Sequence, residues 1–137
     1  MAIRTAVPYL TLDGKAQEAI QFYERALGAK VESLQRFGDV MPSCPDAMKN
    51  QVMHAVVRLG DATIFLSDGS PQNKAIAGNQ VQVALDIQGE SQGREAFEAL
   101  SEGGTVHQPM IDAPWGALFG ALQDRYGIAW MFNVSKS

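Results

Sequence analysis

The residues best suited to chemistry lie on one predicted hairpin. Two β-rich runs flank Gly60-Asp61 in QVMHAVVRLGDATIFLSD, a pattern typical of strands joined by a two-residue turn. Counting outward from that turn pairs His54 with Ser67 in the expected register. Because side chains alternate faces along a strand, one face of the hairpin is predicted to carry six residues. These are His54, Val56, Arg58, Thr63, Phe65 and Ser67.

His54 is the principal candidate for proton transfer or ligand contact, because an imidazole titrates near neutrality. The structural alternative is a half-buried histidine that hydrogen-bonds to Ser67 or to a neighbouring strand. A His54–Ser67 pair does not predict nucleophilic catalysis, since the sequence shows no nucleophile elbow and no obvious orienting carboxylate. Asp68 is equally suited to capping or turning the chain. Arg58 lies near the turn, where it could reach solvent or an anionic ligand.

The remaining reactive residue types give weaker signals. The chain has two histidines, so a three-histidine zinc site is excluded, and His107 is predicted as a strand or loop residue. The single cysteine, Cys44, cannot form an internal disulfide and lies in a proline-broken loop. No glycine-rich strand–turn–helix loop predicts a nucleotide site. We expect no cofactor.

Length and charge limit the function class. At 137 residues the chain is predicted to form a single domain. Its net charge is −4 and its basic residues are scattered, which argues against nucleic acid as a partner. No apolar run is long enough for a membrane helix. The start MAIRTAVPYL does not resemble a secretory signal, so a cytoplasmic location is expected.

The predicted elements repeat along the chain. Residues 3–12 and 31–37 are predicted strands, and the intervening helix should end at Gly28. After the first hairpin, the second half repeats the plan, with a final hairpin around residues 124–127. A shift of 75 positions aligns Gly14 with Gly89, Gln17 with Gln92, Phe22 with Phe97, Gly28 with Gly103 and Val31 with Val106. This self-match predicts two βαβββ modules, about 1–70 and 79–137.

A module of this kind cannot cover both faces of its sheet with one helix. We therefore expect an α+β fold in which two modules form a curved, mostly antiparallel sheet around a cup, with the helices outside.

Three segments carry a family resemblance across nearly the whole chain. VPYLTLDGKAQEAIQFYERALGAKV, VMHAVVRLGDATIFLSD and PWGALFGALQDRYGIAWMFNV together resemble the PhnB-like branch of the vicinal oxygen chelate superfamily. That superfamily includes glyoxalase I, bleomycin-resistance proteins and extradiol dioxygenases. The demethylubiquinone methyltransferase activity associated with this branch finds no support in the residues.

Enzymes of the superfamily bind a divalent metal through two positions in each module. The resemblance places those positions on Pro8, near Phe65, on Gln82 or Val83, and on Met131. Proline, phenylalanine and methionine offer no oxygen or imidazole donor, and only Gln82 could contribute, weakly. We therefore expect no metal.

The resemblance also implies which side chains line the cup. If Phe65 lines the cup, strand alternation places His54 and Ser67 on the same face, and Met131 in the same way shares its face with Asn133. Trp130 is expected in the core and Asp124 in an exposed turn. Gly116 and Gly120 suggest close approach to a strand or ligand. Trp115 could stack on a flat ligand or pack at a subunit seam. The candidate ligand-binding residues are His54, Arg58, Phe65, Ser67, Gln82, Trp115, Gly120, Met131 and Asn133.

The predicted function is metal-independent binding, or conversion, of a small organic molecule held in the cup. His54 is the candidate catalytic residue if a reaction occurs. The alternative is sequestration of a drug without catalysis, as in bleomycin-resistance proteins, and a divalent-metal lyase or dioxygenase is the third possibility. The resemblance also implies a homodimer.

Overall fold

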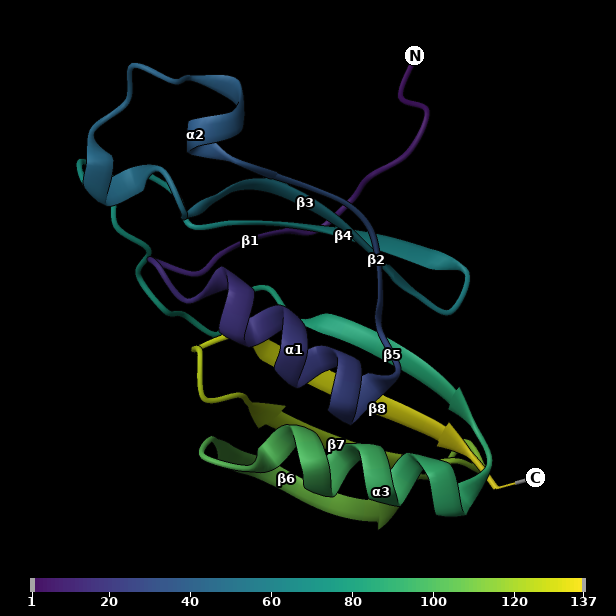
Figure 1. The fold of residues 1–137 in the computed structure, drawn as a ribbon. Helices are drawn as coiled ribbons and strands as arrows, with labels where there is room; N and C mark the ends of the chain where they lie inside the picture. Colours follow the sequence, from purple (N-terminus) through teal and green to yellow (C-terminus); the bar gives the residue numbers. More distant parts are fainter. Residues whose placement is uncertain (1, 137) are drawn as a thin grey trace. The chain divides into compact units, whose positions relative to one another are not determined.

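The computed structural model describes residues 2–136, and the chain divides between Ala75 and Ile76 into two compact units (Figure 1). The first unit comprises β1 (Tyr9–Thr11), α1 (Ala16–Leu27), β2 (Lys30–Arg36), α2 (Phe37–Val40), the 3-10 helix η1 (Asp46–Met48), β3 (Val52–Leu59) and β4 (Ala62–Ser67). The second comprises β5 (Val83–Gln88), α3 (Glu90–Ser101), β6 (Thr105–Asp112), β7 (Leu118–Gln123) and β8 (Ala129–Ser135).

The two units share one topology. The strand orders are β1-β4-β3-β2 and β5-β8-β7-β6, and in each sheet the first and last strands pair in parallel while the other neighbours are antiparallel. Tyr9 pairs with Phe65 as Ala84 pairs with Met131, so Phe65 and Met131 occupy equivalent places. The predicted α+β fold of two βαβββ modules is confirmed. The joining of both sheets around one cup stays a prediction.

In the first unit, α1 covers one face of its sheet. The helix buries its apolar side against β3 and ends, as predicted, at Gly28, whose φ of 68° is a left-handed conformation that glycine adopts without strain. The strand residues beneath it are buried and alternate with half-buried ones, as expected for a sheet packed on one side. Buried on the strands are Ala55, Val57, Ile64 and Leu66.

In the second unit, α3 packs across all four strands (Figure 1). The β8 side chains facing it are Trp130, Phe132 and Val134, all fully buried, which confirms the prediction of a core position for Trp130. The Phe97 ring meets that of Phe132 edge to face, with centroids 5.0 Å apart. Gly93 allows the close packing, because a Cβ at this helix position would clash with Val134.

The first strand is shorter than predicted. Of the expected residues 3–12, only Tyr9–Thr11 form β1. Phe65 N donates a hydrogen bond to Pro8 O, but Pro8 has no N–H with which to continue the ladder. The helices α2 and η1 were also not predicted, because their segments are short and lack apolar periodicity.

Asp124 is buried, not exposed in its turn as predicted. It is 3% accessible and accepts hydrogen bonds from Tyr126 N (2.8 Å), Ile128 N (3.0 Å) and the indole Nε1 of Trp130 (2.8 Å). A carboxylate can be buried when donors surround it, and this one connects the β7–β8 turn to the core tryptophan.

Within residues 2–136, no helix is long and apolar enough to cross a bilayer.

Candidate functional site

The face of the first sheet opposite α1 carries the predicted hairpin set. Val56 pairs with Phe65 and Arg58 with Thr63, so the expected register around Gly60-Asp61 is confirmed. His54, Val56, Thr63 and Phe65 are all half-buried on this face. The open face is thus apolar in the middle and accessible to solvent.

An aromatic cluster lies on this open face. Tyr9, His54 and Phe65 contact one another, with ring centroids 5.5 Å apart for Tyr9–His54, 5.8 Å for Tyr9–Phe65 and 4.9 Å for His54–Phe65. The Tyr9 hydroxyl lies 3.0 Å from His54 Nδ1. When Nδ1 is unprotonated, the phenol donates the hydrogen bond, which fixes the ring and leaves Nε2 for another contact. The cluster therefore presents one oriented imidazole between two aromatic rings.

Tyr9 was missed by the sequence reasoning, which placed Pro8 at this position. Parallel pairing sets Tyr9 beside Phe65, and paired residues of adjacent strands share a face. Local periodicity does not reveal the face of Tyr9, because β1 has only three residues. His54 is thus half-buried and hydrogen-bonded, as in the structural alternative, but its partner is Tyr9 of β1, which lies across β4 in the sheet.

Ser67 does not join this group. The β3–β4 ladder ends at the Ala55–Leu66 pair, one step before the predicted pairing of His54 with Ser67. The Ser67 side chain is buried, and its Oγ accepts a hydrogen bond from Gly69 N at 2.9 Å. Ser67 is therefore engaged in the turn after β4 and is not aimed at a ligand beside His54.

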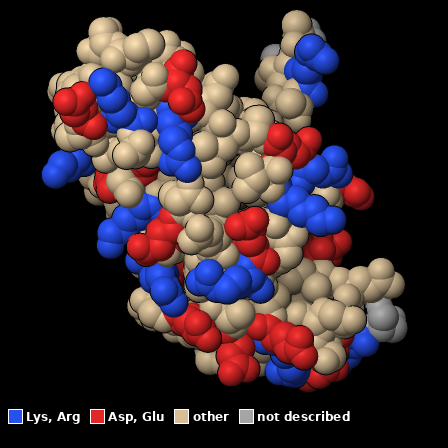
Figure 2. Space-filling view, in the orientation of Figure 1, with Lys and Arg blue, Asp and Glu red and all other residues tan. Residues whose placement is uncertain are grey.

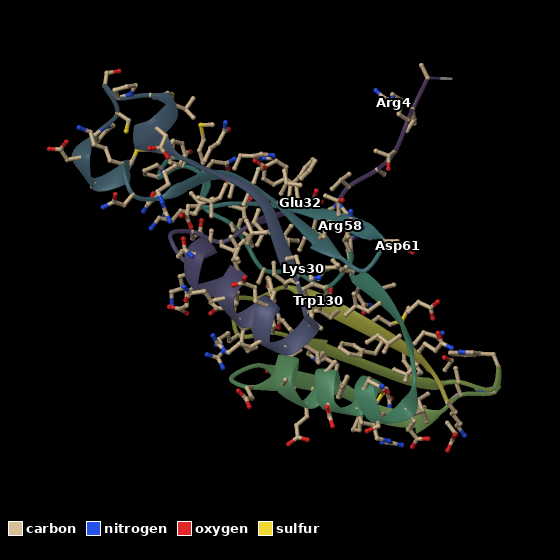
Figure 3. All side chains as sticks on the ribbon, turned by 45° about the vertical axis from the view of Figure 1, so that its right-hand side comes forward. Arg4, Lys30, Glu32, Arg58, Asp61 and Trp130 are labelled. Atoms are coloured by element: carbon tan, nitrogen blue, oxygen red, sulfur yellow. The ribbon has the colours of Figure 1, made fainter. Side chains whose placement is uncertain are left out.

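Arg58 is partly neutralised. Its Nε lies 3.8 Å from a Glu32 carboxylate oxygen, and its Nη2 donates to Gly60 O at 3.2 Å. Figure 3 shows Arg58 with Glu32 and Lys30 near the hairpin end, and Figure 2 shows basic and acidic side chains interspersed on the visible face. Because the charges are mixed, Arg58 is a weak anion-binding group.

The open face of the second sheet carries a second cluster. Trp115 Nε1 donates to Asn133 Oδ1 at 2.8 Å, and Asn133 Nδ2 donates to Asp86 Oδ1 at 3.2 Å. Phe119 pairs with Asn133 across β7–β8, and its ring meets Trp115 edge to face at 5.9 Å. Met131 lies two residues earlier on the same face of β8, where parity predicts it.

Similarity to known proteins decides the family. A family model described as 3-demethylubiquinone-9 3-methyltransferase matches residues 4–132. The chain belongs to this family. Protein YjdN of Escherichia coli K12 is 31% identical over an alignment of 139 positions, which covers 94% of this chain and 94% of that one. Protein PA1353 of Pseudomonas aeruginosa has a crystal structure that is 32% identical with a TM-score of 0.87, covering 98% of this chain and 100% of that one.

More distant structures show the same fold. A PhnB protein from Bacillus cereus is 22% identical with a TM-score of 0.78, covering 96% of this chain and 100% of that one. A glyoxylase/bleomycin resistance protein/dioxygenase domain from Frankia sp. EAN1pec is 15% identical with a TM-score of 0.63, covering 100% of this chain and 94% of that one. Their fold is the one predicted from the resemblance to the PhnB-like branch of the vicinal oxygen chelate superfamily.

The residues of this chain do not fit the divalent metal that the family resemblance implies. Phe65 and Met131 occupy equivalent places on the two open faces and supply no hard donor. The imidazole of His54 and the carboxylate of Asp86, on the same two faces, bond to a phenol and an amide. Among the described residues, no three His, Cys, Asp or Glu side chains group as a metal site. We derive no step through a metal.

Two further predicted residues lie apart from the clusters. Gly120 faces the helix, because a Cβ there would lie 2.7 Å from Phe97 Cε1 and 3.0 Å from Met110 Sδ. Its close neighbour is therefore the α3 layer, and Gly120 is not a ligand contact on the Met131 face. Gln82 is exposed and lies one residue before β5.

One surface ion pair has shifted pKa values. The Lys136 ammonium donates a hydrogen bond to Asp112. This hydrogen bond and the positive charge of Lys136 lower the pKa of the Asp112 carboxyl below its ordinary value of 3.8. The same contact raises the pKa of Lys136 above 10.5. The pair joins the end of β6 to the residue after β8, so it is a structural contact.

Proposed function

We propose that this PhnB-like protein binds a small organic molecule without a metal ion, on the open face that carries Tyr9, His54 and Phe65. The observation that carries the proposal is the cluster itself: two rings flank an imidazole whose Nδ1 is held by a phenol. Small-molecule sites are mostly apolar with a few placed polar groups, and this face has that composition. Arg58, on the same hairpin, is the proposed outlying contact.

The chemistry of the cluster favours a planar or unsaturated ligand with one polar group. Tyr9 and Phe65 offer ring surfaces, and His54 Nε2 can donate to or accept from a carbonyl or hydroxyl of the ligand. If the ligand reacts, His54 is the group that would move a proton, with Tyr9 as a positioning residue. Binding alone, as in drug sequestration, needs the same contacts without turnover.

We do not extend the methyltransferase activity in the family's description to this chain. Methyl transfer requires a site for the methyl donor, and the sequence lacks the glycine-rich loop that commonly holds such nucleotides. Each sheet is a mixed four-stranded sheet and not a parallel doubly wound one.

A thermal-shift screen of metabolites and drugs tests the proposal. A ligand at a hundred times its Kd should add about 2.7 kcal/mol to stability. Binding should survive removal of metals with a chelator, and it should weaken in Phe65→Ala and His54→Gln. The matched control is His107→Gln, an exposed histidine of β6. Binding that disappears when the chelator removes metals, or an affinity that is unchanged in both variants, would refute the proposal.

We also propose that the cup is completed by a homodimer, as the family resemblance implies. Sedimentation at micromolar concentration should give a dimer, and a monomer that still binds the ligand would contradict this part. Once a ligand is known, turnover measured at saturating ligand separates the two modes of action: a turnover that His54→Gln abolishes even at saturation marks an enzyme.

A further inference from the structure

The turn between β6 and β7 holds a tryptophan out toward solvent. Ala113 N donates to Ala117 O at 2.8 Å, and Gly116 N donates to Ala113 O at 3.1 Å, so residues 113–117 form a closed hairpin end. Gly116 takes a φ of 88°, which glycine tolerates and other residues rarely adopt. Trp115 is 62% exposed at this turn. The fold therefore displays a large apolar ring instead of burying it.

The exposed indole is nevertheless fixed in orientation. Its Nε1 is committed to Asn133 Oδ1, and Asn133 is itself oriented by Asp86 through its Nδ2. The edge-to-face contact with Phe119 supports the ring from one side. The polar contacts behind the indole run through Asn133 and end in the Asp86 carboxylate.

Asp86 gives this cluster its charge. Strand parity puts a set of uncharged side chains beside Asp86 on the open face of the second sheet: Ala84, Gln88, Thr105, Gln108, Ile111, Phe119, Ala121, Gln123, Ala129, Met131, Asn133 and Ser135. Of the described residues on this face, Asp86 alone is charged, and its Oδ2 remains for another partner. Lys136, the nearest lysine in sequence to β8, is paired with Asp112.

We infer that Trp115, Asn133 and Asp86 form a binding site for an aromatic cation, which would stack on the indole while its positive charge lies toward the Asp86 carboxylate. An indole face attracts cations through its quadrupole, and tryptophan is the best ring for this contact. A planar cation uses both features at once, whereas an anion would be repelled by Asp86. The site needs only the second unit, so it is independent of the Tyr9–His54–Phe65 cluster.

Nuclear magnetic resonance of the full chain tests the inference, with N-methylquinolinium as the probe and quinoline, uncharged at neutral pH, as its neutral counterpart. The chain has two indole N–H signals. The variant Trp115→Phe assigns the two signals, because it removes that of Trp115. N-methylquinolinium should shift the Trp115 signal saturably and should leave the signal of the buried Trp130 unchanged. Quinoline should bind about two- to fivefold more weakly than the cation.

Asp86→Asn keeps the size of the side chain and removes its charge, so it should abolish the preference for the cation. The matched control is Glu95→Gln, an exposed carboxylate on α3, which should leave the preference unchanged. Added salt should weaken the binding of N-methylquinolinium and leave the binding of quinoline unchanged. Equal affinity for both probes in the unmodified protein, or a preference that persists in Asp86→Asn, would overturn the inference. The amide spectrum of each variant reports whether it is folded.

Discussion

Asp68 is predicted to hold the first unit together. Its Oδ1 accepts from Ala16 N at 2.8 Å, and its Oδ2 accepts from Val52 N at 2.7 Å, with the residue 6% exposed. Ala16 begins α1, and its N–H has no partner within the helix. One carboxylate thus connects the end of β4, the start of α1 and the start of β3, which is the capping role anticipated for it.

The cost of removing it follows from these contacts. A hydrogen bond to a charged group contributes about 1.5–3 kcal/mol, and a carboxylate at a helix N-terminus adds about 0.3–1 kcal/mol. Asp68→Ala leaves two buried N–H groups without an acceptor, so we expect a loss of about 3–7 kcal/mol in the free energy of unfolding. That is a large part of the roughly 5–15 kcal/mol available to a typical domain.

Asp68→Asn discriminates between charge and shape. An amide has one oxygen, so its NH₂ group must face one of the two backbone donors, and about 1.5–3 kcal/mol should be lost. Urea denaturation followed by far-ultraviolet circular dichroism measures both variants, because α1 contributes to that signal. The control is Asp61→Asn in the exposed hairpin turn, expected to stay within about 0.5 kcal/mol. An Asp68→Ala protein as stable as this control would show that the two hydrogen bonds do not stabilise the unit.

Three further predictions concern the second unit. Asp124→Ala should cost about 3–5 kcal/mol in urea denaturation and change the emission of Trp130, whose indole N–H loses its acceptor. Unchanged emission would contradict the hydrogen bond. Asp112→Asn should lower stability at neutral pH. The difference in stability between the two proteins should shrink in acid, as the pH falls below 3.8 and through the lowered pKa of Asp112. In base it should shrink only above pH 10.5, as Lys136 deprotonates. A pH-independent difference would refute the ion pair. Gly120→Ala should cost about 1–3 kcal/mol by overpacking against α3, and a neutral result would argue against the close approach.

Sequence reasoning succeeded where local rules and long-range packing agree. The Gly60-Asp61 hairpin fixed its own register, since a two-residue turn leaves one pairing for every residue outward. The end of α1 was predictable because Gly28 adopts the left-handed conformation. The repeat predicted the topology of both units, and alternation placed Trp130 inside.

It failed where a residue's partner is distant in the chain. The face of Tyr9 depends on its parallel partner Phe65, which strand periodicity within a three-residue β1 cannot reveal. Asp124 looked like any turn aspartate, and its burial depends on the indole that points back at it. Gly120 suggested close approach in general, but only the position of α3 shows that the neighbour is the Phe97 ring.

The pairing of the opening strand with the closing strand has a consequence for synthesis. In each unit the earliest strand can find its place only after the latest one has left the ribosome, since Tyr9 must meet Phe65 and Val83 must meet Trp130. Non-local parallel pairing of this kind is slow to form. The first half can complete its sheet while the second is still being translated, so the growing polypeptide should acquire its structure in two successive steps, one for each repeat.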